Sequence, residues 1–317
     1  MRKPFTVVAV DLGGTKIAGA LVRYEAGEAP AIVARADRPT NAREGGSAVL
    51  ARIIEVCLEL IEQSADAPVG VGIAAAGCID PADGSVAYAN GLMPDWTGQP
   101  LCAAVSEACG LPAAALGDVQ GHALGEARWG AAKTLSSCLL VAAGTGIGGA
   151  YVLEGKVLRG AHGAAGHIGH TLHHRAAEFP CVCGAEAHVE AVTSGTGIGA
   201  LYQGVPVSSA DYDTALDGAE VSRRAEAGEE RAIEALRQSG FILGQACGSW
   251  ANIFDPAAIV LTGTVTKAGP VWYEAVLEGF KTQALVPMQD IAFMPAELGA
   301  DAPLIGAAEH LLDTLEV

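Results

Sequence analysis

The sequence predicts an α/β protein of two domains, on three observations. The chain has 317 residues, which is enough for two domains of ordinary size. Short apolar runs typical of buried strands alternate with segments whose apolar residues recur at helical spacing. A strand, a Gly/Thr turn and a second strand occur twice, as VVAVDLGGTKIAGALV and as LLVAAGTGIGGAYVL. This weak repeat of one supersecondary unit indicates two domains of similar design.

The first half of the chain reads as one α/β domain. Helical spacing of Leu50, Ile53, Cys57 and Ile61 predicts a helix over 45–64, and Gly110 ends a second helix that begins at Leu101. A Pro/Gly/Asn-rich loop is expected between them, at 78–100. Strands are expected at 5–10, 17–22, 31–37, 69–77 and 112–118, and a third helix at 120–130.

The second half repeats the plan and then becomes mainly helical. Residues 137–155 predict a strand, a glycine-rich turn and a strand, and 257–265 predict a late strand that ends in a Gly/Thr turn. Helices are expected from 188 to 252 and at 302–312. We therefore expect an N-terminal domain at 1–118, joined by the C-terminal helix 300–317, and a C-terminal domain at 119–299. The hinge is expected at 118–119.

Composition and charge disfavour several classes of function, among them nucleic-acid binding and membrane binding. Half of the residues are apolar and 17% are charged, which is typical of a globular protein. The net charge of −17 disfavours binding to nucleic acid or to an anionic membrane. Eight scattered cysteines favour a reducing compartment, and MRKPFTVVAV is too short in apolar residues for a secretory signal. The uncharged segment 134–153 approaches the length of a membrane span, but its glycines favour a buried hairpin. We expect a cytoplasmic protein.

Three Gly/Thr turns follow predicted strands, and together they indicate a nucleotide site. Glycine lets the backbone approach a phosphate, and threonine adds a hydroxyl donor. Each turn by itself is equally compatible with a plain hairpin, and none has the dinucleotide or P-loop spacing. The turns are Asp11-Leu-Gly13-Gly14-Thr15-Lys16, Gly144-Thr145-Gly146-Ile-Gly-Gly149 and Thr262-Gly263-Thr264.

Asp118 ends a predicted buried strand, where open α/β sheets bind their ligands. A carboxylate there can accept the proton of a substrate hydroxyl that attacks a phosphoryl group. The alternative is an N-cap for the helix that begins at Val119, and the two roles are compatible.

The segment GAAGHIGHTLHHRAAEFPCVCGAEAHVE holds five of the eight histidines and two cysteines. Imidazole and thiolate are the ligands of Zn²⁺, usually four in a tetrahedron. The spacing of His170, Cys181, Cys183 and His188 predicts such a set, with His173 and His174 as competitors. Four protein ligands leave no open position, so the zinc would be structural. The alternative is a group of surface histidines beside two free thiols.

A structural zinc would position His167 and Glu190 over a substrate. Glu190 is expected to accept hydrogen bonds from substrate hydroxyls, although a first-turn glutamate also suits the helix dipole. Asn90 and Asp95 are candidates for similar polar contacts, with turn formation as the alternative.

With these residues assembled, the chain resembles the ROK family of sugar kinases and related repressors, from Val7 to about Leu312. The motifs that carry the resemblance are VVAVDLGGTKIAGALV, ALGDVQGHALGEARWG, AAGTGIGGAYVLEGKVLRGAHGAAGHIGH, CVCGAEAHVEAVTSGTGIGA and IVLTGTV. The resemblance implies two actin-like (ribonuclease-H-like) ATPase domains around a central cleft that holds ATP. It also implies a homodimer.

The resemblance assigns a role to each candidate. Asp11 would organise Mg²⁺ and its water, and Asp118 would be the general base for a sugar hydroxyl, usually the 6-hydroxyl. His170 would lie at the zinc and beside the sugar, and Glu190 would hold sugar hydroxyls. The first phosphate site would comprise Gly13, Gly14, Thr15 and Lys16, the second Thr145 and Gly146, and Gly263 would lie near the adenosine.

Three departures from the family pattern bear on the substrate. Gly117 replaces the usual Asn before the base, which removes one sugar contact, and His188 stands where the third Cys of C-x-C-G-x-x-G-C-x-E belongs. His167 replaces the Glu of G-E-x-G-H, and its loop is similar to the A-G-H-I-G-H-T-L of bacterial N-acetylmannosamine kinases. We therefore expect an ATP-dependent kinase of an N-acylmannosamine, with glucose or another hexose as the alternative.

Two functions from other classes compete with the kinase. The family's repressors carry an N-terminal helix-turn-helix domain, and a first strand at Phe5 leaves no room for one. A non-catalytic sugar-binding or regulatory protein is disfavoured by the retained Asp11, Asp118 and Glu190, whereas Gly117 keeps that alternative open.

Overall fold

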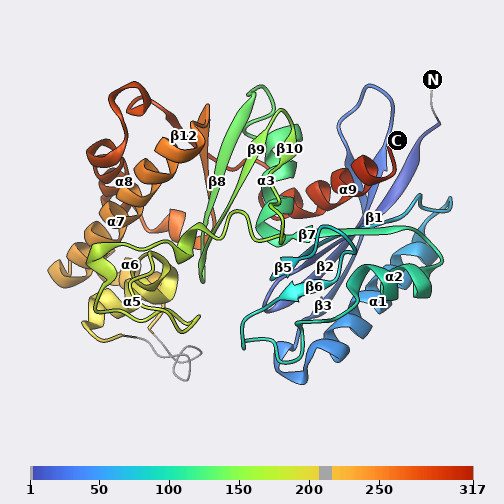
Figure 1. Cartoon of the computed structure of the whole chain (residues 1–317), viewed down its shortest axis with the longest axis horizontal. Helices are drawn as coiled ribbons and strands as arrows, with labels where there is room; N and C mark the ends of the chain where they lie inside the picture. The colour runs from blue at the N-terminus through green and yellow to red at the C-terminus, as the bar shows by residue number, and fades with distance from the viewer. Residues whose placement is uncertain (1–2, 207–215, 317) are drawn as a thin grey trace. The chain divides into compact units, whose positions relative to one another are not determined.

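The computed structural model describes residues 3–206 and 216–316, which fall into two compact units (Figure 1). The first unit contains the chain up to Thr134, Val152–Ala165 and the chain from Glu297 onward; the second contains Leu135–Tyr151 and Gly166–Ala296. This division differs from the expected boundary at residue 118. The reason is that α3 (Asp118–Trp129) packs against α9 (Ala302–Thr314) within the first unit.

The first unit is built on a mixed sheet in the order β3-β2-β1-β4-β7. Strands β1, β2 and β3 are antiparallel neighbours, whereas β1, β4 and β7 run parallel. Parallel strands end at the same edge of a sheet, so Asp11 near the end of β1 and Asp118 directly after β7 share that edge. The bounds are β1 (Phe5–Leu12), β2 (Lys16–Tyr24), β3 (Ala31–Pro39), β4 (Val71–Ala75) and β7 (Ala113–Gly117).

Alternate residues of β1 enter two different cores, because successive side chains of a strand point to opposite faces. Val8 and Val10 are fully buried on the side of α1 (Gly46–Gln63) and α2 (Leu101–Cys109). Val7 and Ala9 are fully buried with residues of α9. A strand buried on both faces explains why the sequence shows a continuous apolar run at this position.

A second five-stranded sheet repeats the same plan, in the order β10-β9-β8-β11-β12. Strand β8 takes the central place that β1 has in the first sheet, and β11 lies parallel to it as β4 lies parallel to β1. The internal repeat predicted from the sequence is therefore confirmed at the level of strand order. The bounds are β8 (Ser137–Ala143), β9 (Ile147–Leu153), β10 (Lys156–Val157), β11 (Ala258–Thr262) and β12 (Ala292–Pro295).

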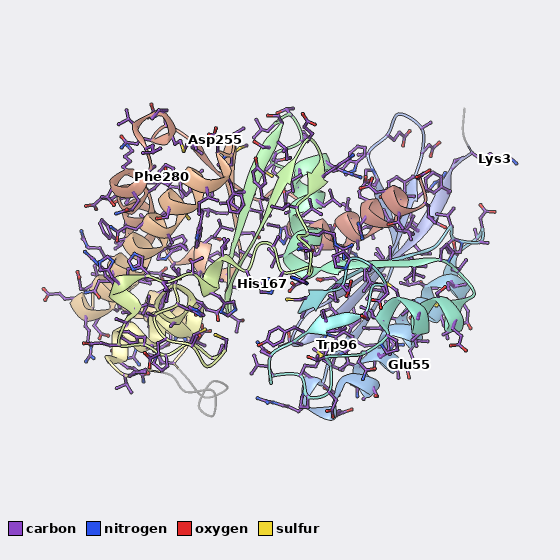
Figure 2. All side chains as sticks on the ribbon, in the orientation of Figure 1. Lys3, Glu55, Trp96, His167, Asp255 and Phe280 are labelled. Atoms are coloured by element: carbon purple, nitrogen blue, oxygen red, sulfur yellow. The ribbon has the colours of Figure 1, made fainter. Side chains whose placement is uncertain are left out.

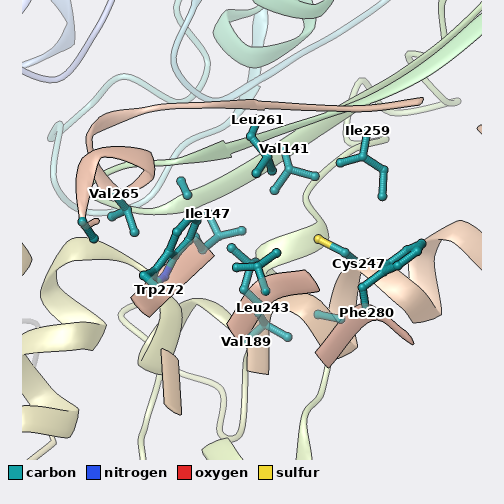
Figure 3. Packing of buried hydrophobic residues seen from close by; sticks show 14 of the residues in the cluster. Val141, Ile147, Val189, Leu243, Cys247, Ile259, Leu261, Val265, Trp272 and Phe280 are labelled. Carbon is teal, nitrogen blue, oxygen red and sulfur yellow. The ribbon is translucent and has the colours of Figure 1, made fainter. Parts of the chain in front are cut away.

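The helices of the second unit cover a core that contains Trp272 and Phe280 (Figure 3). The close packing of α7 on α8 requires glycine at three positions of α7 spaced four residues apart, Gly240, Gly244 and Gly248. A Cβ on Gly240 would lie 2.3 Å from the carbonyl oxygen of Trp272, and one on Gly244 would lie 2.0 Å from that of Val276. The bounds are α4 (Glu190–Thr193), α5 (Gly195–Gln203), α6 (Gly218–Glu226), α7 (Glu230–Phe254) and α8 (Pro270–Gln283).

Most elements expected from the sequence are confirmed, and the segment 134–153 forms strands β8 and β9 as predicted. Strand β12 was not predicted, because its four residues lack both alternation and a long apolar run. The loop expected at 78–100 contains the short pair β5 (Cys78–Ile79) and β6 (Val86–Tyr88). Within the described residues, none of the helices has the length and apolar character that a membrane crossing requires.

Candidate functional site

In the first unit, the turn between β1 and β2 exposes its tip. The Gly13 N–H donates to the Lys16 carbonyl at 2.9 Å and closes the turn, while Gly14 and Thr15 are exposed. Thr40 braces the turn from behind: its N–H donates to the Thr15 carbonyl, and its hydroxyl donates to the Gly13 carbonyl at 2.8 Å. Thr40 is fully buried, and nothing in the sequence pattern indicated its role.

Lys16, expected at a phosphate, forms an ion pair here with Asp37 at 2.9 Å. Both side chains are about half exposed, so water screens the pair and its free energy is small. The ammonium group can therefore be transferred to an anionic ligand at little cost.

Asp11 and Asp118 form a pair of repelling carboxylates at one edge of the first sheet. Burial, followed by the charge of Asp118, raises the pKa of Asp11 to about 7, while Lys16 acts in the opposite direction. Two carboxylates that repel each other favour the binding of a cation, because a bound cation would offset the repulsion. This observation fits the Mg²⁺ role predicted for Asp11.

Asp118 is the first residue of α3, and its Oδ1 accepts the Val119 N–H at 2.9 Å. The expected N-cap position falls instead on Gly117. A Cβ on Gly117 would meet only Gln120, at 3.5 Å, so the position has room for a side chain. Buried Gln120 accepts the Gly117 N–H and donates to the carbonyls of Gly163 and Ala165. This bracing residue was not predicted from the sequence.

Asn90 lies exposed in the loop between β6 and α2, where its Oδ1 accepts the Leu92 N–H at 3.2 Å. This contact matches the turn-forming alternative for Asn90. Asp95 has a left-handed backbone with φ of 55°, which also suits a turn. The loop is anchored by buried Trp96 (labelled in Figure 2), whose Nε1 donates to the Ala76 carbonyl at 3.0 Å.

In the second unit, two of the predicted turns converge. Gly263 has φ of 97°, and a Cβ there would lie 2.2 Å from the Ala143 carbonyl oxygen. Ala143 directly precedes the turn at Gly144–Gly146, in which the Gly144 N–H donates to the Gly146 carbonyl at 3.0 Å. The third turn therefore requires glycine and lies against the second.

Glu190 contacts the same glycine-rich turn. Its Oε2 accepts the Ile147 N–H at 2.8 Å and would lie 2.5 Å from a Cβ on Gly146. The Gly195 N–H donates to the Gly144 carbonyl, and the Thr196 hydroxyl to the Thr145 carbonyl. Gly195 and Thr196 were not among the predicted site residues, although the second Gly-Thr-Gly-Ile-Gly at 195–199 was a signal for them.

The four predicted metal ligands come together in the second unit. One ligand atom from each of His170, Cys181, Cys183 and His188 lies within 4.8 Å of every other, and no other such group of His, Cys, Asp or Glu occurs among the described residues. The Nδ1 atoms of His170 and His188 are 3.2 Å apart. His173 and His174 stack on one another outside this set.

The pKa shifts of Cys181 and His188 are consistent with a bound cation at this set of residues. Burial, together with the nearby Cys183 and Glu190, raises the pKa of the Cys181 thiol to about 12, so a thiolate at Cys181 needs a positive partner. Burial and His170 lower the pKa of His188, which favours the neutral imidazole that binds metals. The donor set of two thiols and two imidazoles is one that Zn²⁺ takes.

His167 (labelled in Figure 2) lies exposed at the start of the short helical turn Ile168–His170. Its ring stacks on that of His170, with centroids 6.2 Å apart and an interplanar angle of 18°. His167 therefore lies against one of the four candidate metal ligands, at an exposed position of the loop.

Comparison with known proteins gives a consistent result. The ROK family profile matches residues 7–313. The chain is 33% identical to a glucokinase of Halalkalibacterium halodurans, over 94% of this chain and 92% of that protein. It is 30% identical to an N-acetylmannosamine kinase of Escherichia fergusonii, over 96% of this chain and 97% of that protein.

Among solved structures, the chain is similar to the ROK hexokinase from Thermus thermophilus, with a TM-score of 0.82 and 29% identity. The match covers 99% of this chain and all of that one. Similarity at this level confirms the predicted fold class, an α/β protein of the actin-like ATPase type.

Proposed function

This chain belongs to the ROK family and is an ATP-dependent sugar kinase, and on that premise we propose that it phosphorylates the 6-hydroxyl of an N-acylmannosamine or a related hexose. The observation that carries the proposal is His167, which stacks on His170 in the loop AGHIGHTL. An imidazole at this position offers the substrate one nitrogen that donates and another that accepts, whereas a glutamate would only accept.

In the proposed reaction, Asp118 accepts the proton of the sugar 6-hydroxyl. The hydroxyl oxygen attacks the γ-phosphorus of ATP, a bond from the sugar oxygen to phosphorus forms, and the bond from phosphorus to the ADP oxygen breaks. The start of α3 holds the Asp118 carboxylate through the Val119 N–H. Glu190, His167 and Asn90 are proposed to bind sugar hydroxyls.

The phosphates are proposed to lie on the glycine turns. Gly13, Gly14, Thr15 and Lys16 would form the first site, Thr145 and Gly146 the second, and Gly263 would lie near the adenosine. Asp11 would hold Mg²⁺ through water, and that ion supplies charge neutralisation to the phosphates. The raised pKa of Asp11 supports this assignment, because a bound cation favours the ionised carboxylate.

His170, Cys181, Cys183 and His188 are proposed to hold one structural Zn²⁺, which supplies a cross-link of the loop and no reactive water. The replacement of a cysteine by His188 leaves a competent ligand in place. A homodimer and a cytoplasmic location remain predictions.

Glucose is the second candidate substrate, and a specific observation favours it. Identity to the Halalkalibacterium glucokinase is 33%, compared with 30% to the Escherichia N-acetylmannosamine kinase. The two candidates share the same catalytic groups and differ only in the sugar.

A panel of sugars separates these two candidates. N-acetylmannosamine, mannose, N-acetylglucosamine and glucose are supplied with ATP and Mg²⁺, and ADP release is measured. We expect the highest kcat/KM with N-acetylmannosamine. A higher value with glucose would replace the proposed substrate, and no turnover with any hexose would favour the non-catalytic sugar-binding or regulatory alternative.

Asp118→Asn tests the base. Loss of the proton acceptor should lower kcat on the order of 10²–10⁴-fold, while the sugar Kd from calorimetric titration changes little. The exposed Glu107→Gln, on α2 of the same unit, is the matched control and should keep full activity. A kcat within threefold of wild type would remove Asp118 from the catalytic role.

Gly117→Asn tests the missing sugar contact. The position has space for a side chain, so the variant should fold and gain an amide beside Asp118. We expect a lower KM for the best sugar of the panel, by about 1 kcal/mol or fivefold for one added hydrogen bond. Gly110→Asn at the end of α2 is the control, since asparagine tolerates its φ of 64°. An unchanged KM would show that position 117 does not face the sugar.

A further inference from the structure

Glu190 uses its two carboxylate oxygens for different neighbours. Oε2 accepts the Ile147 N–H of the second glycine turn at 2.8 Å, and Oε1 lies 3.7 Å from Sγ of Cys181, within hydrogen-bonding range of that thiol. Cys181 is one of the four candidate metal ligands. The half-buried Glu190 side chain thus contacts both the candidate metal ligands (His170, Cys181, Cys183 and His188, here called the metal set) and the turn proposed to bind a phosphate.

The segment 190–196 makes three hydrogen bonds with the glycine turn. Besides the side-chain contact to Ile147, the Gly195 N–H donates to the Gly144 carbonyl at 2.8 Å, and the Thr196 hydroxyl to the Thr145 carbonyl at 3.5 Å. The Glu190 contact is the one that reaches the backbone N–H groups of the turn. A Cβ at position 146 would lie 2.5 Å from Oε2, so a side chain there would displace the Glu190 carboxylate.

The same segment is tied to the metal set at its other end. His188 lies two residues before Glu190 and pairs with Leu172 in a β-bridge, and the Val189 N–H donates to the Thr171 carbonyl at 2.9 Å. Helix α4, which begins at Glu190, has only four residues, too few to be stable on its own. The position of Glu190 therefore depends on what holds residues 170–189 in place.

From these contacts we propose that Glu190 couples metal binding by the four candidate ligands to the conformational order of the glycine turn at 144–149. A metal that cross-links His170, Cys181, Cys183 and His188 reduces the conformational freedom of the segment, and Glu190 passes this order to Ile147. Metal loading therefore strengthens nucleotide binding without any metal contact to the nucleotide. Glu190 acts here as a positioning residue, and the inference rests on the proposed phosphate and metal assignments.

The test measures nucleotide affinity in the absence of sugar. Full-length protein is prepared loaded with Zn²⁺ and stripped by a chelator, and each form is titrated with Mg²⁺ and a non-hydrolysable ATP analogue in a calorimeter. We expect the stripped form to bind the analogue at least fivefold more weakly, the lower end of typical coupling between sites.

Two variants separate transmission from a general loss of structure. Glu190→Ala removes the acceptor, so its affinity should be weak and should change less than twofold on stripping. Glu190→Gln keeps an oxygen that accepts the Ile147 N–H, so it should restore the dependence on metal. If Glu190→Ala keeps the full dependence, if stripping leaves the wild-type affinity unchanged, or if the protein takes up no Zn²⁺, the proposal is overturned.

Hydrogen exchange provides a readout that does not involve ligand binding. Amides of residues 144–149 should exchange faster in stripped wild type and in Glu190→Ala than in loaded wild type, whereas buried amides of α7 should not change. Equal protection of residues 144–149 in the loaded and stripped forms would contradict the proposal. Because neither measurement uses a sugar, a failure of the proposed substrate leaves both results interpretable.

Discussion

His310 on α9 shows how the surroundings of one side chain set its charge. Its Nε2 lies 3.3 Å from Nη1 of Arg159. Burial, and next the positive charge of Arg159, lowers the pKa of His310 to about 4, with Arg128 adding to Arg159 and Asp313 acting in the opposite direction. In the unfolded chain the imidazole titrates near 6.5. The folded protein therefore binds fewer protons than the unfolded chain between these values, so its stability falls as the pH drops from about 6.5 to 4.

Replacing His310 with glutamine should remove this part of the pH dependence. The glutamine side chain does not titrate, and its amide oxygen can still accept from Arg159. We expect the free energy of unfolding, measured in urea, to shift in favour of the variant by roughly 1–2 kcal/mol at pH 5 relative to pH 8. His162→Gln, at an exposed histidine, should leave the wild-type pH dependence in place. Parallel curves for wild type and His310→Gln would show that His310 is not the titrating group.

At the scale of elements, α3 connects the predicted base to the segments that lead into and out of the second unit. Glu126 near its C-terminal end is fully buried. Its carboxylate accepts three backbone N–H groups, those of Ala131, Glu297 and Leu298, at 2.8–3.0 Å. These residues lie a few positions before Leu135 and directly after Ala296, where the chain passes between the units. One carboxylate thus fixes both connecting segments within the first unit.

Glu126→Ala should therefore be strongly destabilising. Three backbone N–H groups, of which that of Ala131 is buried, would lose their acceptor, and we expect a loss of about 3–5 kcal/mol in the free energy of unfolding. Glu126→Gln keeps one accepting oxygen and should lose less. Unfolding followed by tryptophan fluorescence reports on the change, and the exposed Glu234→Ala serves as the control with an effect within about 0.5 kcal/mol. A loss below about 1 kcal/mol in Glu126→Ala would mean that water replaces the carboxylate.

At the scale of the whole molecule, the net charge of −17 is a repulsive contribution that folding has to overcome. Most ion pairs in the described residues are exposed and contribute little, and an exception is the pair of Arg128 with the buried Glu309 at 2.8 Å. Salt screens the repulsion, with a Debye length of about 30 Å at 0.01 M and about 8 Å at 0.15 M.

The melting temperature should accordingly rise by roughly 1–2 °C between 0.01 M and 0.15 M NaCl, a change of about 1 kcal/mol. Replacement of the exposed Asp66, Glu107 and Glu278 by lysine lowers the net negative charge and should reduce the rise. Differential scanning calorimetry measures both. A melting temperature that falls with salt would show that attractive pairs outweigh the net repulsion.

The predictable part of the fold comes from patterns that lie within one segment. The continuous apolar run at 5–10 and the helical spacing at 45–64 reflect burial on both faces of β1 and on one face of α1. β12 and the role of Glu126 escaped prediction, because both depend on partners far along the chain.

The features of the candidate site also separate into those that the local sequence predicted and those that only the structure shows. His170, Cys181, Cys183 and His188 lie within 18 residues of one another, so their residue types and spacing predicted the set. The contact of Glu190 with Ile147, the ion pair of Lys16 with Asp37 and the bracing of the first turn by Thr40 had no sequence signal. Residue type and local spacing thus determined which candidate groups for phosphate, sugar and metal this protein carries. Only the tertiary structure decided which of them touch, because hydrogen bonds and ion pairs depend on distance in space and not along the chain.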